Sequence, residues 1–212
     1  MKDNKTIEVN SIIQSPTIPS AFEVSDEEKI DKIAKHFKTI METLGLDLSD
    51  DSLKETPKRV AKMYVSEIFS GLNPKNKPEV TLFKNNYGYN QMLVEKNISV
   101  YSMCEHHFVP IIGRAHVAYI ANGKVIGLSK IHRMVKYFSQ RPQVQERLTR
   151  QIMENLKQTL NIDDVAVVID ARHMCVECRG VEDVTSSTIT SAISGQFQED
   201  STRSEFMRFI GM

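Results

Sequence analysis

The 212-residue sequence lacks the features that mark several large classes of protein. Its 27 basic and 27 acidic residues cancel, which argues against a globally basic nucleic-acid or anionic-membrane binder. No window approaches the roughly 18 apolar residues that a membrane helix requires, and residues 1–14 show no secretory signal pattern. Three cysteines are an odd number, which disfavours a closed disulfide scaffold and favours a reducing compartment. We therefore expect a cytoplasmic, soluble protein.

The composition is that of an ordinary globular chain, with 41% hydrophobic and 25% charged residues. The length suits one domain with an extension, and such a domain buries a core without disulfide support. Residues 1–24 are polar and without sustained periodicity, so we expect a mobile N-terminal arm there. Residues 25–75 form a predicted N-terminal helical region, and residues 76–212 carry the predicted strands in one domain.

Two amphipathic helices are predicted in the N-terminal region. Ser25 and Glu28 have the spacing of a capping box, apolar residues recur at three and four positions over 30–44, and Gly45 follows as a stop. A second helix begins at Thr56-Pro57, where proline is tolerated, and ends near Gly71.

From residue 80 onward the pattern favours strands and a further pair of helices. Asn122-Gly123 predicts a hairpin between the strand ending at Ile120 and a strand over 125–126. Ser129 is the expected cap of the helix over 129–140. The predicted strands are 80–83, 92–103, 111–120, 165–171 and 181–197, and the predicted helices are 129–140, 143–160 and 201–209. This order indicates an α+β fold with a mostly antiparallel sheet, whose strand edges we expect oligomerisation to close.

Two short clusters concentrate the side chains that bind transition metals. Cys104-Glu105-His106-His107 ends one predicted strand, and a second cluster with His173, Cys175 and Cys178 ends another. Strand ends on one sheet can meet, so Cys104, His107 and one cysteine of the second cluster would form a Cys2His site. Three protein ligands with one open position are the catalytic arrangement of zinc. His106 and His173 would remain beside the metal as proton carriers.

The pair Cys175 and Cys178 has other interpretations. It could be half of a zinc ribbon or a redox dithiol. A second C-x-x-C is absent, and no βαβ pattern precedes this one. The zinc deaminase signature is also incomplete, because H-x-E is missing and Met174 stands where proline belongs.

A second group of candidate functional residues is a cluster of basic side chains. Between residues 128 and 150 one acid, Glu146, stands among six basic residues: Lys130, Arg133, Lys136, Arg141, Arg147 and Arg150. A solvated helix face is the common fate of such a run. Yet Ser129-Lys130 at a helix start offers backbone N–H groups, a hydroxyl and a charge, which suits phosphate, and Arg59 and Arg179 could join them. The sequence contains neither a P-loop nor a G-x-G-x-x-G motif.

Glu146 is the exception in this basic segment. Its carboxylate can accept two parallel hydrogen bonds, as from the N1–H and N2–H2 edge of guanine. The default for a helical glutamate is an ion pair four residues along, here with Arg150. Spacing alone leaves both interpretations open.

Taken together, four segments resemble the GTP cyclohydrolase I family: ETPKRVAKMYVSEIFSGL, CEHHFVPIIGRAHVAYI, VIGLSKIHRMVKYFSQRPQVQERLTRQI and DARHMCVECRG. The resemblance covers nearly everything from about Ser49 to Arg208. It implies the tunnelling fold, in which the sheets of the subunits join into a barrel and two pentameric rings stack as a decamer. The domain over 76–212 would then be the catalytic tunnelling-fold domain, with active sites between subunits.

The resemblance implies an enzyme that converts GTP and water into formate and 7,8-dihydroneopterin triphosphate, the first step toward folate or biopterin. Zinc would be the cofactor, and its bound water would attack C8 of the purine. His173 would protonate N7, and His106 would serve later proton transfers. The matching residues are Cys104, His107 and Cys175 as zinc ligands, His106 and His173 as catalytic residues, Gln145 and Glu146 for guanine, and Ser129, Lys130, Arg133, Arg179 and Arg59 for triphosphate and ribose.

Two positions depart from the family pattern. Cys178 stands where Ala or Met is usual, and it could compete for zinc or form a disulfide with Cys104 or Cys175. His132 stands where Asn or Ala is common, and it would add a titrating group near the phosphates or simply lie on a helix surface.

Two functions of other classes remain open at this level. A non-catalytic, zinc-stabilised assembly module would need a fourth protein ligand, for which Cys178 is the obvious candidate. Another tunnelling-fold enzyme would act on a pterin or a deazapurine. The CEHH segment and the Gln145-Glu146 pair argue against the latter.

Overall fold

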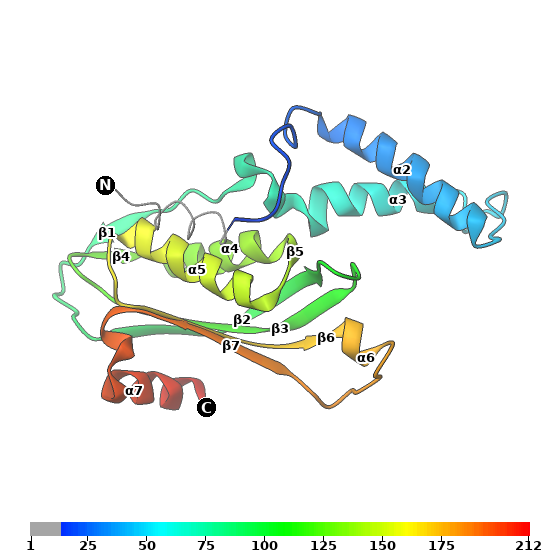
Figure 1. Ribbon diagram of the computed structural model, residues 1–212. Helices are drawn as coiled ribbons and strands as arrows, with labels where there is room; N and C mark the ends of the chain where they lie inside the picture. The colour runs from blue at the N-terminus through cyan, green and yellow to red at the C-terminus, as the bar shows by residue number, and fades with distance from the viewer. Residues whose placement is uncertain (1–13) are drawn as a thin grey trace, which may run out of the picture.

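A computed structural model describes residues 14–212 of the chain, so most of the predicted mobile arm, residues 1–13, lies outside the described residues. The molecule is layered around a five-stranded sheet, with helices α4 and α5 on one face and helix α7 on the other (Figure 1). This arrangement confirms the predicted α+β class.

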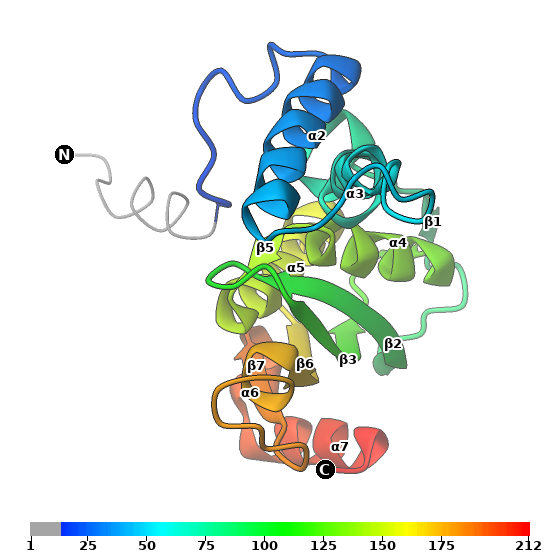
Figure 2. The same ribbon diagram turned by 90° about the vertical axis from the view of Figure 1, so that its right-hand side faces the viewer.

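The N-terminal helices form as the sequence predicts. Helix α2 spans Asp26–Thr43, and the side chain of Ser25 accepts a hydrogen bond from the backbone N–H of Glu28 at 3.2 Å. Gly45 follows at φ 82°, the left-handed conformation that ends helices. Helix α3 spans Thr56–Met63 and continues through a π-helical turn, η1 (Tyr64–Ile68), and a 3-10 turn, η2 (Ser70–Leu72). A last short turn, η3, spans Pro74–Asn76. Figure 2 shows α2 and α3 at the side of the molecule opposite to α7.

The main sheet has the strand order β5-β2-β3-β6-β7. Strands β2 (Met92–Cys104), β3 (Pro110–Ile120), β6 (Val165–His173) and β7 (Thr188–Ile193) are antiparallel neighbours. The short β5 (Pro142–Gln143) joins β2 in parallel at Met103 and Cys104, so among residues 14–212 most of β2 has one unpaired edge. Strand β7 is shorter than the predicted strand over 181–197.

The predicted hairpin at Asn122-Gly123 is wrong in its pairing. Gly123 does make the turn, at φ 73°, but β4 (Lys124–Ile126) pairs with β1 (Leu82–Lys84) in a separate two-stranded sheet. The cause is that both edges of β3 are already occupied at this end, since Tyr119 lies opposite Leu93 on β2 and Val165 on β6. The chain therefore has to leave the sheet after Ile120.

The main core lies between the sheet and the helices α4 (Leu128–Ser139) and α5 (Gln145–Leu160). The N-cap of α4 is Gly127, not the predicted Ser129, and α5 begins two residues later than predicted because β5 takes Pro142 and Gln143. A smaller core on the other face holds Phe206 of α7 (Asp200–Ile210) and Phe197 of the turn η4 (Gly195–Gln198).

Different elements lie at the two ends of the central sheet. The turn after Cys104 and the end of β6 lie at one end, and the β1–β4 ribbon lies at the other (Figure 1). The 11 residues of β3 span roughly 35 Å between them. Helix α4 begins next to β4 and leads into β5 beside Cys104, so it runs from the ribbon end to the Cys104 end. None of the described helices is both long and apolar enough to span a bilayer.

Candidate metal centre and nucleotide site

A tight turn after β2 carries the first cluster. The backbone N–H of Cys104 donates to Val109 at 2.8 Å, and that of Phe108 donates to Cys104 at 2.9 Å. Phe108 adopts φ 54°, which lets the chain reverse within four residues. Cys104 is therefore buried at the end of the strand, while His106 and His107 stand on the exposed turn.

The second cluster follows β6. His173, the last residue of β6, lies opposite Ile111 of β3, and the four-residue helix α6 (Met174–Glu177) then turns Cys175 toward the first cluster. Nε of Arg172 donates to Glu177 at 2.8 Å, which ties the end of the strand to the end of α6.

The two clusters meet in a group of three potential metal ligands. One ligand atom each from Cys104, His107 and Cys175 lie within 4.8 Å of one another. Tetrahedral zinc with these donors has ligand atoms about 3.5–3.8 Å apart, so small side-chain adjustments would close the group on an ion. Burial, followed by the hydrogen bond to the Cys104 thiol, raises the pKa of Cys175. A dication reverses this effect by stabilising thiolates, and two cysteines with one histidine are a donor set that zinc prefers. The residues fit the implied metal.

Cys178 is not part of this group. Its thiol is exposed and donates to the carbonyl oxygen of Met174 at 2.8 Å, within the turn that ends α6. The group thus contains three candidate protein ligands, the number that leaves an open position on zinc.

A largely buried ion pair, which we did not predict, supports the turn after β2. Nη1 of Arg147 lies 2.5 Å and Nη2 lies 3.2 Å from the carboxylate of Glu105. The hydrogen bond from Arg147 is the main reason that the pKa of Glu105 is lowered. Arg147 lies in the first turns of α5, so the pair joins the Cys104 turn to the start of that helix. The sequence contained one hint, namely an acid in the middle of a run of metal ligands.

The two predicted catalytic histidines flank the group differently. His173 is half-buried, and its Nε2 lies 2.7 Å from Oε1 of Gln145. Burial lowers the pKa of His173, and the negative charge of Glu146 opposes that effect. His106 is exposed, with Nδ1 3.7 Å from the sulfur of Cys104, and it lines a cavity of about 390 Å³ with Glu105 and Phe108.

The two residues predicted to recognise guanine have opposite environments. Glu146, in the first turn of α5, is exposed. The alternative ion pair with Arg150 is not formed in the part of the chain that the structure describes. Gln145 is only 1% exposed, and its side-chain amide bonds to protein groups on both sides.

The predicted phosphate-binding residues do not come together in one chain. Nη1 of Arg179 lies 3.3 Å from Nε2 of His107, so Arg179 borders the metal group. Ser129, Lys130 and Arg133 belong to the first half of α4, whose start lies a helix length of roughly 18 Å from the Cys104 end. Arg59 is exposed on α3.

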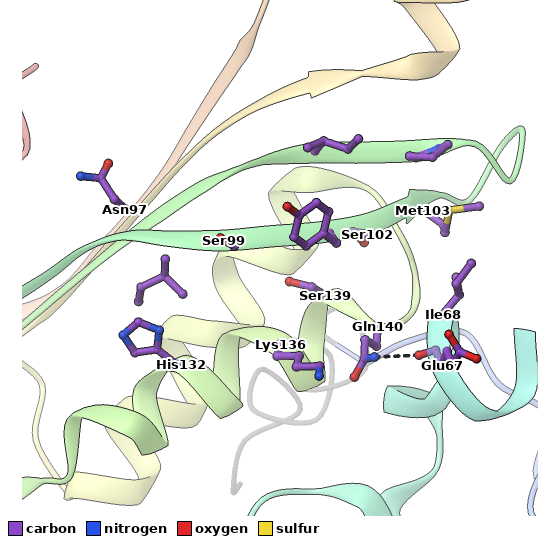
Figure 3. Close-up of a pocket in the computed structure, with 14 residues that line it drawn as sticks. Glu67, Ile68, Asn97, Ser99, Ser102, Met103, His132, Lys136, Ser139 and Gln140 are labelled. Atoms are coloured by element: carbon purple, nitrogen blue, oxygen red, sulfur yellow. Dashed lines mark hydrogen bonds between the residues drawn. The ribbon is translucent and has the colours of Figure 1, made fainter. Parts of the chain in front are cut away.

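A cavity of about 640 Å³ lies along β2, and none of the three potential metal ligands lines it. Figure 3 shows Ser99, Ser102 and Met103 of β2 on one side. His132, Lys136, Ser139 and Gln140 of α4 line the other side. Gln140 closes one end by donating to the backbone of Glu67 at 2.7 Å. His132, for which the sequence left a place near the phosphates or on a helix surface, is exposed on α4, and its Nε2 lies 3.0 Å from the carboxylate of Glu95.

Comparisons with known proteins point to one family. A model of the family described as GTP cyclohydrolase I matches residues 33–211. A protein named GTP cyclohydrolase 1 from Flavobacterium johnsoniae is 57% identical over 201 residues, covering 95% of this chain and 90% of the relative. Proteins of the same name from Vibrio vulnificus and Aeromonas salmonicida are each 53% identical over 196 residues, covering 92% of this chain and 89% of each relative.

Proposed function

The chain belongs to the GTP cyclohydrolase I family, and we propose that it converts GTP and water into formate and 7,8-dihydroneopterin triphosphate. This reaction is the first step toward tetrahydrofolate and related pterins. The observation that carries the proposal is the group of Cys104, His107 and Cys175, whose ligand atoms lie within 4.8 Å of one another. His106 lies 3.7 Å from Cys104 of that group, and the exposed Glu146 lies near His173, two residues before Cys175. These are the functional groups that hydrolytic opening of a purine ring requires.

Zinc is the metal that we assign to this group. The donor set of two cysteines and one histidine favours it over the hard cations magnesium and calcium, which prefer oxygen ligands. When bound with an open position, zinc supplies an activated water molecule as the nucleophile for C8. The metal-binding turn itself is held by the ion pair between Glu105 and Arg147. That pair fixes the direction of the ligands before metal arrives.

Glu146 is the residue that we assign to the guanine edge. Its carboxylate is exposed and can accept two hydrogen bonds from N1–H and N2–H2. Adenine presents no such pair of donors, so ATP would leave the carboxylate unpaired and be rejected. Gln145 is a weaker candidate for this contact than the sequence suggested, because its amide is occupied within the protein.

His173 is the residue that we assign to proton transfer at N7 of the purine. Protonation there makes C8 more electrophilic and prepares the ring bond for cleavage. Its ring is half-buried two residues before Cys175, and the charge of Glu146 opposes the lowering of its pKa by burial, which suits a group that exchanges one proton. His106, more exposed and 3.7 Å from Cys104, is assigned to the later proton transfers.

The triphosphate would be held by cations from more than one chain. Arg179 is close to His107, whereas Ser129, Lys130 and Arg133 lie toward the far end of α4. A closed homo-oligomer would bring the α4 of one subunit to the metal group of another, and Arg59 would join from α3. The unpaired edge of β2 and the outer edge of β7 support such an assembly, since free strand edges pair with other chains. The family resemblance makes a decamer of two stacked pentamers the expected form.

The test is GTP turnover by the purified protein, scoring formate and the oxidised fluorescent pterin together. Equal amounts of both, lost on chelation and restored by zinc, are the expected result. Glu146→Gln should abolish turnover without changing assembly, whereas Glu154→Gln on the same helix should not. No product from zinc-loaded, assembled protein would contradict the proposal. A zinc-bound scaffold, or an enzyme for a pterin or deazapurine, would then be the better assignment.

A further inference from the structure

Gln145 holds an amide that is enclosed on all sides by protein. The residue is the first of α5 and is 1% exposed. Its Nε2 lies 3.0 Å from the carbonyl oxygen of Ile169 and 2.8 Å from that of Thr188. A third contact, at 3.1 Å, reaches Oγ1 of Thr190. On the opposite side, Oε1 lies 2.7 Å from Nε2 of His173.

The surrounding groups determine which way the amide points. Carbonyl oxygens of Ile169 and Thr188 only accept hydrogen bonds, so the NH2 group must face them. The hydroxyl of Thr149 donates to the backbone oxygen of Gln145 at 2.8 Å. The hydroxyl of Thr190, 2.7 Å from that of Thr149, must then donate to it and accept from Gln145. A flipped amide would set its oxygen against two carbonyl oxygens, which the network excludes.

The direction of the amide in turn determines where His173 carries its proton. The oxygen Oε1 of Gln145 has no hydrogen to give, so the hydrogen between the two side chains belongs to Nε2 of His173. In the neutral ring, Nδ1 is then the nitrogen with the free lone pair. In the protonated ring, Nδ1 is the nitrogen whose hydrogen is available to another group.

We propose that Gln145 is a positioning residue that holds His173 in the Nε2–H tautomer, so that Nδ1 is the atom that exchanges a proton with N7 of the purine. This inference rests on the proposed function and gives Gln145 a role different from the guanine contact that the sequence predicts. The backbone carbonyls of β6 and β7 orient the amide, and the amide orients the imidazole. The ring of His173 is thus oriented at the end of β6, directly before α6, the short helix that carries Cys175.

The tautomer can be measured without any turnover. Solid-state NMR of the zinc-loaded, assembled protein labelled with 15N-histidine reports which ring nitrogen carries hydrogen, and the signal missing in His173→Asn identifies the residue. With the ring neutral, we expect hydrogen on Nε2 of His173. Hydrogen on Nδ1 would overturn the proposal.

The matched kinetic comparison is Gln145→Met against Gln143→Met. Gln143 is an equally buried glutamine whose amide donates to Phe138 at 2.9 Å and to Gln151 at 2.7 Å, and not to His173. We expect Gln145→Met to lower kcat on the order of 10²-fold, with the KM for GTP within about threefold and zinc content unchanged. Gln143→Met should keep kcat within about threefold.

The possible outcomes separate the two proposals. A raised KM with normal kcat in Gln145→Met would overturn the positioning role and restore the guanine contact. If Gln145→Met does not fold, the wild-type NMR spectrum still decides the tautomer. Hydrogen on Nε2 in a wild-type protein that produces no formate from GTP would support the geometry, while the proposed function would fail.

Discussion

The two ends of the central sheet differ in how completely a single chain assembles the candidate functional groups. At the Cys104 end, three potential metal ligands, a bidentate ion pair and a buried amide network assemble within one chain. At the start of α4, Ser129 and Arg133 are exposed on a helix surface, and no ligand of the Cys104 end lies near them. The candidate reacting groups are held by backbone and buried hydrogen bonds, whereas the cations that we propose for the triphosphate are exposed on the first half of α4.

This difference has an energetic basis. Buried donors and acceptors must be paired, so the Cys104 end has few alternative arrangements. Exposed cations are already well solvated. Their electrostatic attraction to a phosphate becomes strong only when a second surface excludes water from around them. We therefore expect metal binding to need an intact Cys104 end, and GTP binding to need both ends from different subunits.

The largest effect should come from replacing one of the candidate metal ligands at the Cys104 end. Cys175→Ser removes a thiolate, and we expect zinc content to fall and formate production to drop on the order of 10³-fold or more. Metal analysis and a formate assay on the same sample measure both. Cys178→Ser, three residues away, is the control with the same chemical change. Full zinc content in Cys175→Ser would contradict the assignment of this ligand.

The next effect tests whether the two ends come from different chains. Lys130→Ala should lower kcat/KM for GTP by about 10–100-fold, because it removes a charge-assisted contact to phosphate. Mixing unfolded Lys130→Ala and Cys175→Ser chains in equal amounts and refolding them together should restore about a quarter of the sites, since each half is intact with a probability of one half. Recovery of no activity from correctly assembled mixtures would place both ends of each site in one chain.

Local patterns predicted much of the Cys104 end. The spacing of Cys104 and His107, and their position after a strand, indicated ligands that the structure brings to Cys175. The caps at Ser25 and Gly45 were also readable, because capping depends on a few adjacent residues. Such features need no knowledge of the rest of the chain.

Features that depend on distant partners were missed. The hairpin at Asn122-Gly123 was wrong because only the tertiary structure shows that both edges of β3 are occupied. The pair of Glu105 and Arg147 joins residues 42 positions apart, and nothing local distinguishes Arg147 from the neighbouring Arg150. The burial of the Gln145 amide likewise arises from carbonyl groups on β6 and β7.

A smaller effect tests how far the ion pair contributes to the order of the Cys104 end. Arg147→Met leaves the Glu105 carboxylate without its partner, and we expect the affinity for zinc to fall about 10-fold, as is typical when support of a ligand is lost. Competition with a zinc chelator measures the change. Arg150→Met, which alters an exposed residue of the same helix, should leave zinc affinity unchanged. Equal affinities in the two variants would show that the turn after β2 holds its shape without Arg147.

The smallest effect concerns Cys178, the thiol nearest in sequence to the metal group yet outside it. Cys178→Ala removes an exposed hydrogen bond to Met174, so we expect stability within about 0.5 kcal/mol of the wild type and turnover within about twofold. Zinc content and formate production before and after mild peroxide treatment complete the measurement. If Cys178 forms a disulfide with Cys175 or Cys104 under peroxide, the wild type should lose zinc and the variant should retain it. Three free thiols in treated wild-type protein would instead show that Cys178 forms no disulfide with Cys104 or Cys175, so its exposed thiol neither joins the metal group nor disrupts it.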